Sequence, residues 1–391
     1  MNICILATDY LPSYNGATIR VSGLAKALSS LKYKVVVIIP SNNNKFSRNI
    51  LSGIIIYKIP CKKYFISGKL EIYTKFNFGR YLSYNKYIWD IIKNEKINII
   101  HTRPQLDFCY LGMKIKKRLN LPLFIEMHRL SSIVDYEIGK INFLNFKFLF
   151  RLERYLLNKS DHLIVLSEIG KNEFLNHGVK SNIIVVPNAS HMIAHKVKSA
   201  NLPFPKKNRI LLYAGTMREN EGVENLILAF DLLTKKVNNV NLILIGKGEK
   251  KSHIVELVKK LDLKKQILFL EDLTNDEIMR YFKSADLFVH PRKDISYHRN
   301  FIGLKFYDAL AFGLPIITYD IGEAGNFVKS NKIGIVTLPN IQDFSNSVIL
   351  LLKNKRMYKT MKLNSLKLNK KISWANSALI LHNIYKIYLD K

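Results

Sequence analysis

The stretch from Asn300 to Pro315 has the residue types and spacing of a site for a phosphorylated ligand. Gly303 precedes a helical pattern, and Asp308 lies one turn into that pattern. Backbone N–H groups at the start of a helix bind phosphate, so Leu304 and Lys305 are candidate phosphate contacts. The ammonium of Lys305 would add a positive charge, although a lysine on an exposed helix face is the common alternative. Since the carboxylate of Asp308 could accept hydrogen bonds from two ribose hydroxyls, the stretch predicts nucleotide binding.

Glycines stand at three other places where a strand pattern gives way to a helix pattern. Gly16 follows the first predicted strand, Gly215 ends the first predicted strand of the second half, and Gly222 opens the helix after it. A glycine lets backbone N–H groups approach an anion closely. Taken singly, each is more simply explained as a turn glycine, and anion binding is the alternative that its position offers.

Most standard catalytic and binding motifs are absent from the sequence, which contains no GxxxxGK, HExxH or GxSxG. Gly246-Lys-Gly248 resembles the start of a GxGxxG loop, but Lys251 stands in place of the third glycine. His191 and His195 are four residues apart without an acidic residue that would complete a zinc motif, and no Asp-x-Asp pair occurs. The sequence therefore predicts no metal ion.

The elements that would position these residues alternate between short apolar strands and helix-length amphipathic segments. Near-continuous apolar strands alternating with helices are typical of parallel sheets covered on both faces. In the first half the strands are Asn2–Ala7, Lys34–Ile39, Gly53–Lys58, Asn98–His101, Pro122–Met127, His162–Leu166 and Asn182–Pro187. In the second half they are Arg209–Ala214, Asn241–Ile245, Gln266–Leu270, Asp286–His290, Pro315–Thr318 and Gly334–Thr337.

The alternation stops once, between about residues 189 and 207, where Pro203 and Pro205 interrupt any period. We therefore expect two doubly wound, Rossmann-like α/β domains that face each other across a cleft, with ligands at the carboxyl ends of the strands. The predicted limits are 1–190 for the first domain, 191–207 for a linker and 208–372 for the second domain.

Composition excludes several classes of protein. With 391 residues and 48% hydrophobic residues, the chain can bury two cores and is not intrinsically disordered. Its three cysteines, Cys4, Cys61 and Cys109, are too few and too dispersed for a disulfide framework. The apolar runs are too short to span a membrane, and the N-terminus lacks the features of a signal peptide. We expect a protein of the reducing cytoplasm.

The formal net charge of +31 predicts attraction to polyanions. No nucleic-acid-binding motif accompanies this charge, so nucleic-acid binding is only a weak alternative. Two basic and aromatic segments, 62–82 and 141–155, are candidates for contact with anionic lipid. For 141–155 a core helix is the favoured interpretation, whereas for 62–82 the two interpretations are equally supported.

Several short motifs in order along the chain resemble a known enzyme family. They are Pro12–Gly16 before Val21–Leu28, Phe124-Ile-Glu-Met-His128, Ser160-Asp161 with Ser167, Val185-Val-Pro-Asn188, Tyr213–Gly222, Leu244–Gly248, Ser284–Pro291, Asn300–Pro315 and Ser373-Trp374 with Tyr385. Together they resemble the GT-B glycosyltransferases of family 4, which are retaining nucleotide-sugar transferases. The resemblance extends over nearly the full chain.

The resemblance implies a metal-independent transferase of the hexosyltransferase type that needs no cofactor besides its nucleotide-sugar donor. It places the donor on the second domain, at Gly215, Thr216, Gly303, Leu304, Lys305 and Asp308. It implies that Gly16 and His128 face the donor from the first domain, that His128 contacts the transferred sugar, and that Asn300 bonds a sugar hydroxyl. The acceptor would be a glycan or a lipid-linked acceptor of cell-surface polysaccharide, lipopolysaccharide or glycolipid synthesis. A terminal helix, 373–391, would return to the first domain, and the enzyme would work in the cytoplasm, peripherally at the inner face of the membrane.

The sequence departs from the family at the diphosphate site. Thr216 and Glu221 occupy positions where the family has an arginine and a lysine. We expect Arg218 to supply the missing charge, with Lys305 as second choice and Arg292 as a further candidate.

The acidic pair of the family, eight residues apart, becomes Asn300 and Asp308, with Asp294 as an alternative first acid. The family's later glutamate aligns with Asn326, while Glu323 stands nearby. A catalytically impaired relative and a nucleotide-sugar epimerase on the same fold remain alternatives.

Overall fold

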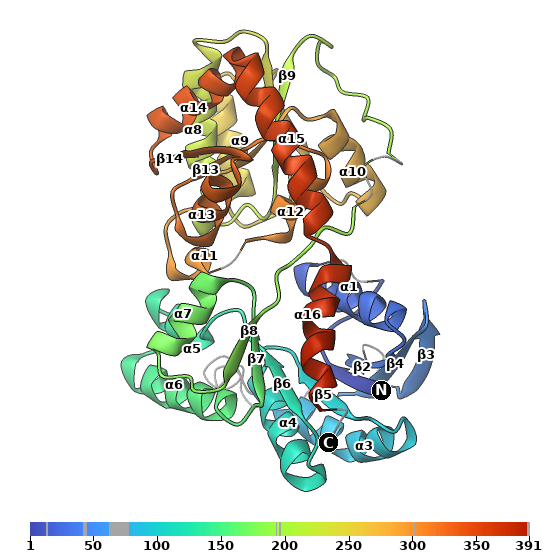
Figure 1. Ribbon diagram of the computed structural model, residues 1–391. Helices are drawn as coiled ribbons and strands as arrows, with labels where there is room; N and C mark the ends of the chain where they lie inside the picture. The colour runs from blue at the N-terminus through green and yellow to red at the C-terminus, as the bar shows by residue number, and fades with distance from the viewer. Residues whose placement is uncertain are drawn as a thin grey trace. The chain divides into compact units, whose positions relative to one another are not determined.

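The computed structural model describes residues 1–12, 15–41, 45–61, 78–192, 194, 197–300 and 302–388. These residues form two compact units (Figure 1). Unit 1 comprises Met1–Pro187 together with Trp374–Lys391, and unit 2 comprises Asn188–Ser373. Most of the segment expected to be a linker, 191–207, packs on unit 2, since Met192 is buried in its core and the N–H of Ala200 bonds Ser284 Oγ at 2.8 Å.

Unit 1 contains an eight-stranded sheet in the order β3-β4-β2-β1-β5-β6-β7-β8. All neighbouring strands are parallel except β3, which runs antiparallel to β4. The strands are β1 (Asn2–Leu6), β2 (Lys34–Ser41), β3 (Ser47–Leu51), β4 (Ile54–Pro60), β5 (Ile99–Thr102), β6 (Leu123–Glu126), β7 (His162–Val165) and β8 (Asn182–Val185). The helices are α1 (Gly16–Ser30), α3 (Phe78–Asn94), α4 (Leu106–Leu119), α5 (Ser131–Glu137), α6 (Phe143–Leu157), α7 (Glu168–Asn176) and α16 (Trp374–Lys386).

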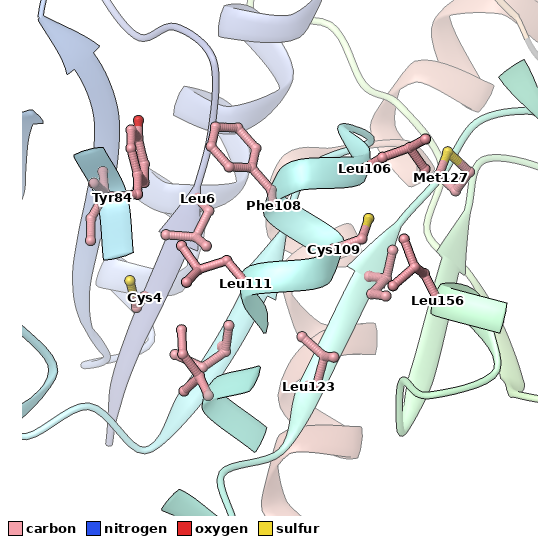
Figure 2. Packing of buried hydrophobic residues seen from close by; sticks show 14 of the residues in the cluster. Cys4, Leu6, Tyr84, Leu106, Phe108, Cys109, Leu111, Leu123, Met127 and Leu156 are labelled. Atoms are coloured by element: carbon pink, nitrogen blue, oxygen red, sulfur yellow. The ribbon is translucent and has the colours of Figure 1, made fainter. Parts of the chain in front are cut away.

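Each face of this sheet is covered by its own hydrophobic core, because successive strand residues point to opposite faces. Cys4 and Leu6 of β1 pack with Phe108 and Leu111 of α4 on one face (Figure 2). Ile3 and Ile5 of the same strand pack on the other face with α1 and the chain's last helix, α16. A Cβ atom on Gly23 of α1 would lie 2.5 Å from the ring of Trp374, so glycine is what allows these helices to approach.

Unit 2 contains a fully parallel sheet in the order β11-β10-β9-β12-β13-β14. Its strands are β9 (Arg209–Ala214), β10 (Val240–Ile245), β11 (Ile267–Leu270), β12 (Leu287–His290), β13 (Ile316–Tyr319) and β14 (Gly334–Thr337). Its helices are η2 (Glu219–Glu221), α8 (Val223–Thr234), α9 (Lys251–Lys260), α10 (Asn275–Ser284), α11 (Ser296–Arg299), α12 (Leu304–Ala311), α13 (Gly322–Asn331), α14 (Ile341–Lys353) and α15 (Lys355–Lys371). Two cores again cover the two faces, which confirms the expected doubly wound α/β class.

Helix α6 departs in part from the expectation of a core helix. Leu149, Leu156 and Leu157 are buried, but Phe143 and Phe148 are 50% and 62% exposed. The aromatic stripe therefore faces both core and solvent. Most of the other candidate lipid-contact segment, 62–82, lies outside the described residues. Among the helices that the structure describes, none is both long enough and apolar enough to cross a bilayer.

Candidate functional site

In each sheet the chain begins at an inner strand, adds strands on one side of it, and then crosses over to add strands on the other side. In unit 1 this topological switch lies between β1 and β5, and in unit 2 it lies between β9 and β12. At a switch point the loops after neighbouring strands diverge to opposite faces of the sheet and leave room at the carboxyl ends of the strands. The predicted site residues fall on the loops at or near these two points.

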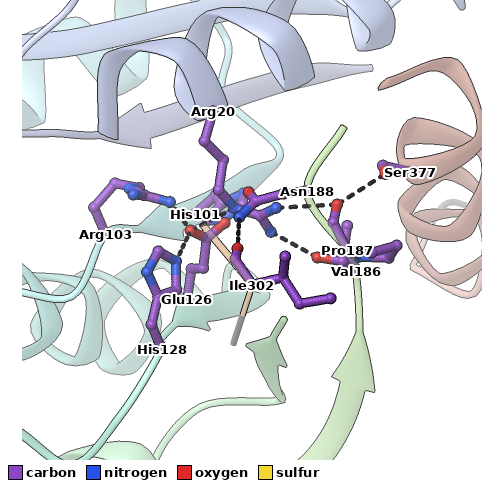
Figure 3. A network of polar contacts seen from close by, with 10 residues as sticks. All are labelled: Arg20, His101, Arg103, Glu126, His128, Val186, Pro187, Asn188, Ile302 and Ser377. Atoms are coloured by element: carbon purple, nitrogen blue, oxygen red, sulfur yellow. Dashed lines mark hydrogen bonds and ion pairs between the residues drawn. The ribbon is translucent and has the colours of Figure 1, made fainter. Parts of the chain in front are cut away.

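In unit 1 the carboxyl edge holds a buried charge network around Glu126, the last residue of β6 (Figure 3). Arg20 of α1 donates from Nε to Glu126 Oε1 at 2.9 Å. Arg103, which directly follows β5, forms an ion pair with the same carboxylate. His128 Nε2 lies 2.7 Å from Glu126 Oε1, and His101 Nε2 lies 3.7 Å from Oε2. One carboxylate thus serves two arginines and two histidines.

Arg20 also ties this network to two more segments of unit 1. Its Nη2 donates to the carbonyl of Val186 at 3.0 Å and its Nη1 to the carbonyl of Pro187 at 3.2 Å. Ser377 Oγ of α16 donates to the same Pro187 carbonyl at 3.0 Å. The network therefore links α1, β6, the segment after β8 and α16.

The two histidines of this network are held in their neutral forms. Burial, together with the positive charges of Arg103 and Arg20, lowers the pKa of His101 to about 3. Burial and the same two arginines, with Arg129, hold the pKa of His128 well below its usual range. Because a carboxylate only accepts hydrogen bonds, the proton of neutral His128 resides on Nε2, toward Glu126.

Gly16 is the first residue of α1, but the start of this helix already has a cap. The side chain of Asn15 accepts hydrogen bonds from the N–H groups of Ala17 and Thr18, at 2.9 and 3.0 Å. Thr18 Oγ1 in turn accepts from the N–H of Asn15, which completes a capping box. An anion at Gly16 would have to compete with the Asn15 side chain.

In unit 2 three loops at the carboxyl edge pack backbone against backbone. A Cβ atom on Gly246, after β10, would lie 1.8 Å from the carbonyl oxygen of Gly215, after β9. A Cβ atom on Gly222 would lie 1.9 Å from the carbonyl oxygen of Pro291, after β12. Close backbone packing thus explains why glycine is needed at Gly246, Gly248 and Gly222. A dinucleotide-binding loop is not needed to explain them.

A polar chain joins the loops after β9 and β12. Thr216 Oγ1 donates to Glu221 Oε1 at 3.3 Å, and Arg292 Nε donates to Glu221 Oε2 at 2.9 Å. Nη2 of Arg292 lies 3.2 Å from the position of a Cβ atom on Gly303. Arg218 is exposed and forms no ion pair among the described residues. The arginine that the structure brings to Glu221 is therefore Arg292.

Helix α12 begins at Leu304 with Gly303 as its N-cap residue and, in contrast to α1, has no side-chain cap among the residues that the structure describes. One turn in, Asp308 is 1% exposed. Its carboxylate accepts hydrogen bonds from Ser190 Oγ at 2.7 Å and from Lys305 Nζ at 3.2 Å, and His191 Nδ1 lies 4.0 Å away. Lys305 is thus paired rather than free on the helix face.

The two candidates for the first acid differ in their surroundings. Asn300 directly follows α11 and is 5% exposed. Asp294 is half exposed and bonds Arg299 through two contacts of 2.6 and 2.9 Å. The Arg299 guanidinium lowers the pKa of Asp294, which is therefore ionised at neutral pH.

Comparisons with known proteins agree with this architecture. Residues 14–190 match the family described as Glycosyltransferase Family 4, and residues 194–368 match the family described as Glycosyl transferases group 1. The chain belongs to the GT-B glycosyltransferases of the family 4 type. The expected family is thereby confirmed.

This glycosyltransferase has distant relatives, some of which are similar to it over most of their length. It is 23% identical over 388 residues to an alpha-monoglucosyldiacylglycerol synthase of Acholeplasma laidlawii, covering 93% of this chain and 92% of the relative. Its fold is similar to that of a sucrose-phosphate synthase of Thermosynechococcus elongatus, with a TM-score of 0.79, 18% identity and coverage of 100% and 99%. It is also similar to the Anabaena protein HepE solved in complex with UDP, with a TM-score of 0.72, 15% identity and full coverage of both chains.

The structure groups the predicted site residues of this glycosyltransferase unit by unit. In unit 1 it connects His128 to Arg20, His101, Arg103 and Glu126, four residues that the sequence analysis missed. A signal was present, since Glu126 interrupts a buried apolar strand and Arg20 lies between buried Ile19 and Val21. A charged residue inside an apolar run is buried only when it has partners.

Proposed function

We propose that the chain transfers a sugar, with retention of anomeric configuration, from a nucleoside-diphosphate sugar to a glycan or lipid-linked acceptor. The observation that carries the proposal is the uncapped start of α12 at the switch-point edge of unit 2, with Arg292 beside Gly303 and Asp308 one turn further on. A helix start without a side-chain cap among the described residues, next to a guanidinium, suits a diphosphate. HepE, a protein of similar fold, was solved with UDP.

In the proposed complex the donor diphosphate accepts hydrogen bonds from the N–H groups of Leu304 and Lys305. Gly215 and Thr216, after β9, lie near the nucleotide. Asp308 accepts hydrogen bonds from the ribose hydroxyls, and these replace the bonds that it now accepts from Ser190 and Lys305.

Neutral His128 contacts the transferred sugar, and Glu126 keeps its imidazole in one orientation. Asn300 bonds a sugar hydroxyl. The reaction breaks the bond between the anomeric carbon and the diphosphate oxygen and forms a bond from that carbon to an acceptor hydroxyl oxygen. The departing diphosphate takes the hydroxyl proton, so the protein contributes position and charge stabilisation rather than a nucleophile, and no metal ion is required.

The acceptor is proposed to lie at an anionic membrane. Tyr136, Phe143, Leu144, Phe148 and Tyr155 are exposed apolar residues on α5 and α6, which we call the α6 surface. Basic residues surround them: Lys147 Nζ lies 4.4 Å from the ring centre of Phe143, Lys159 Nζ lies 5.2 Å from that of Tyr155, and Lys140 and Arg151 are exposed. Exposed aromatic residues among cations fit the interface of an anionic bilayer.

This proposal places the enzyme in the cytoplasm, at the inner face of the membrane, in the synthesis of a cell-surface polysaccharide, lipopolysaccharide or glycolipid. The Acholeplasma relative is named for a glycolipid product. A catalytically impaired relative is the second candidate, because the carboxylate of Glu221 lies where a diphosphate needs cations.

Proton NMR spectroscopy of the product tests the reaction. The enzyme is incubated with an α-configured nucleotide sugar and a glycolipid acceptor, and the coupling constant of the anomeric proton is measured. We expect an α-linked product and one nucleoside diphosphate per bond formed. A β-linked product would overturn retention, and an absence of transfer with every donor that binds would favour the impaired relative.

A further inference from the structure

We propose that Arg292 binds the diphosphate of the donor and that Glu221 is the positioning residue that aims its guanidinium. This inference rests on the proposed function, since it names the charge that holds the donor at the same site. It differs from the expectation drawn from the sequence, in which Arg218 has this role and Lys305 is second.

Arg292 lies where it can reach a ligand at the start of α12. It lies two residues beyond the end of β12, at the switch point next to β9. Its Nε donates to Glu221, and this bond leaves the two Nη groups for other acceptors. Nη2 lies beside Gly303, at 3.2 Å from the place of a Cβ atom, and any larger residue there would crowd the guanidinium. Arg292 and the start of α12 therefore converge on one place.

One guanidinium nitrogen of Arg292 is an unsatisfied hydrogen-bond donor. Nη1 of Arg292 is shielded from solvent and has no hydrogen-bond partner among the described residues. A shielded guanidinium nitrogen without an acceptor is costly, because burial removes its water. A phosphate oxygen at the start of α12 would supply that acceptor and would be bound by a charge-assisted hydrogen bond.

Glu221 is held in place by the packing of two loops. It ends η2 and directly precedes Gly222, whose φ of +73° and contact with Pro291 hold the turn against the loop after β12. The same two loops are joined by the N–H of Lys293, which bonds the carbonyl of Asn220 at 3.1 Å. The ammonium of Lys293 also bonds Glu219 at 2.6 Å. Glu221 is thus a rigid acceptor that fixes the guanidinium of Arg292.

The other two cations are less well placed. Arg218 is exposed, with no polar side-chain contact among the described residues, so ordering its side chain on a ligand would cost conformational entropy. Lys305 already bonds the carboxylate of Asp308. A pre-ordered guanidinium binds with a smaller loss of entropy than either of them.

Substitutions of the two residues should change the diphosphate affinity in opposite directions. Glu221→Gln keeps an oxygen that can accept from Arg292 Nε but removes a negative charge beside the diphosphate, so affinity should rise about threefold to tenfold. Arg292→Ala removes the cation, and affinity should fall by roughly 10- to 100-fold. A merely structural role of Glu221 would make Glu221→Gln weaken binding or leave it unchanged.

The experiment is calorimetric titration of the full chain with UDP, GDP and ADP, and then with the matching nucleoside of whichever diphosphate binds. Arg292→Ala and Glu221→Gln are compared with Arg218→Ala as the matched control from the neighbouring loop. We expect both effects on the diphosphate, less than a twofold effect of Arg218→Ala, and nucleoside affinity within threefold of wild type throughout. Arg292→Lys, which retains a charge but not the fork of the guanidinium, is measured in case Arg292→Ala unfolds, and it should lose about fivefold or more.

The outcomes separate the two proposals. If the wild-type chain binds none of the three diphosphates, the proposed function fails. If it binds one of them but Arg292→Ala and Arg292→Lys change the affinity less than twofold, the inference is overturned. A larger effect of Arg218→Ala would likewise overturn it and would restore the expectation drawn from the sequence.

Discussion

Arg20 Nε and Glu126 Oε1 lie 2.9 Å apart, in side chains that are 1% and 0% exposed, although the two residues are 106 positions apart in the sequence. Burying two charges costs several kcal/mol of desolvation, and their attraction roughly offsets that cost. Such a pair contributes little net stability while both partners are present, and removing one partner is costly. Its effect here is to fix the position of α1 relative to the end of β6, next to His128.

Glu126→Ala should lower the free energy of unfolding by about 3–5 kcal/mol, because it leaves Arg20 and Arg103 buried without their carboxylate. Glu126→Gln, which retains one acceptor oxygen, should cost less than Glu126→Ala. Urea unfolding at pH 7.5 measures both. Glu168→Gln, at a side chain that is 72% exposed, is the control and should change stability by less than about 0.5 kcal/mol. A cost for Glu126→Ala as small as that of the control would show that the network carries no such energy.

Glu173 on α7 is expected to make stability depend on pH. Burial, followed by the charge of Glu137, raises the pKa of Glu173 to about 7. A carboxyl group with a raised pKa in the folded state resists ionisation, so its contribution to stability is fully present below an unfolded pKa of about 4.3. That contribution falls as the pH rises toward 7 and is lost above it.

Glu173→Gln should therefore stabilise the chain at pH 8 by about 1–2 kcal/mol, a value reduced for the solvent that reaches this half-buried group. At pH 4 the substitution should have almost no effect. Urea midpoints at the two pH values measure the difference, and Glu168→Gln, at an exposed side chain of the same helix, is measured in parallel. A stabilisation of equal size at both pH values would mean that ionisation of Glu173 is not its cause.

The glycine packing of unit 2 predicts a large effect at Gly246. Gly246→Ala would force its Cβ atom to within 1.8 Å of the Gly215 carbonyl oxygen, so we expect a loss of at least 3 kcal/mol or displacement of the loop after β9. Gly139→Ala is the matched control, because Gly139 also has a positive φ, of +69°, but nothing lies within 4 Å of its Cβ position. The control should cost only about 1 kcal/mol, from backbone strain alone. Similar thermal shifts for the two variants would refute the packing argument.

The α6 surface predicts binding to anionic vesicles. The double variant Leu144→Ser/Phe148→Ser should lower the partition coefficient on vesicles containing phosphatidylglycerol at least tenfold, because two exposed apolar side chains no longer enter the interface. Vesicle sedimentation measures it. Leu350→Ser on α14, at a residue that is 50% exposed, is the control. Equal binding of the double variant and wild type, or equal binding to phosphatidylcholine vesicles, would exclude this surface as the docking site.

Local pattern was sufficient to predict most of the sheets. Strand β9 has the predicted bounds, Arg209–Ala214, because a continuous apolar run is what a strand buried on both faces requires. Strand β3 (Ser47–Leu51) escaped prediction, since it is an exposed antiparallel edge strand whose Ser-Arg-Asn start carries no apolar alternation. Edge strands lie outside the pattern that buried strands share.

The candidate site was predictable where its chemistry is local and not where it depends on distant partners. Gly303 and Asp308 are only five residues apart, at the start of α12 and one turn into it, so their spacing alone indicated a nucleotide site. Arg20 of α1 and Arg103 after β5 bond Glu126, and Arg292 after β12 bonds Glu221 from 71 residues away. A charge in an apolar run signals that a partner exists, but only the sheet order identifies it.

The central claim is that unit 2 holds a nucleotide-sugar donor through Asp308 while His128 of unit 1 acts on the transferred sugar. The most direct measurement is release of nucleoside diphosphate from a panel of UDP-, GDP- and ADP-sugars by wild type, Asp308→Asn and His128→Ala, with donor affinity measured in parallel. We predict that wild type turns over one donor, that Asp308→Asn loses donor affinity at least tenfold, and that His128→Ala binds the nucleotide normally but loses transfer. Unchanged donor affinity in Asp308→Asn, or collapse of nucleotide affinity in His128→Ala, would contradict the account.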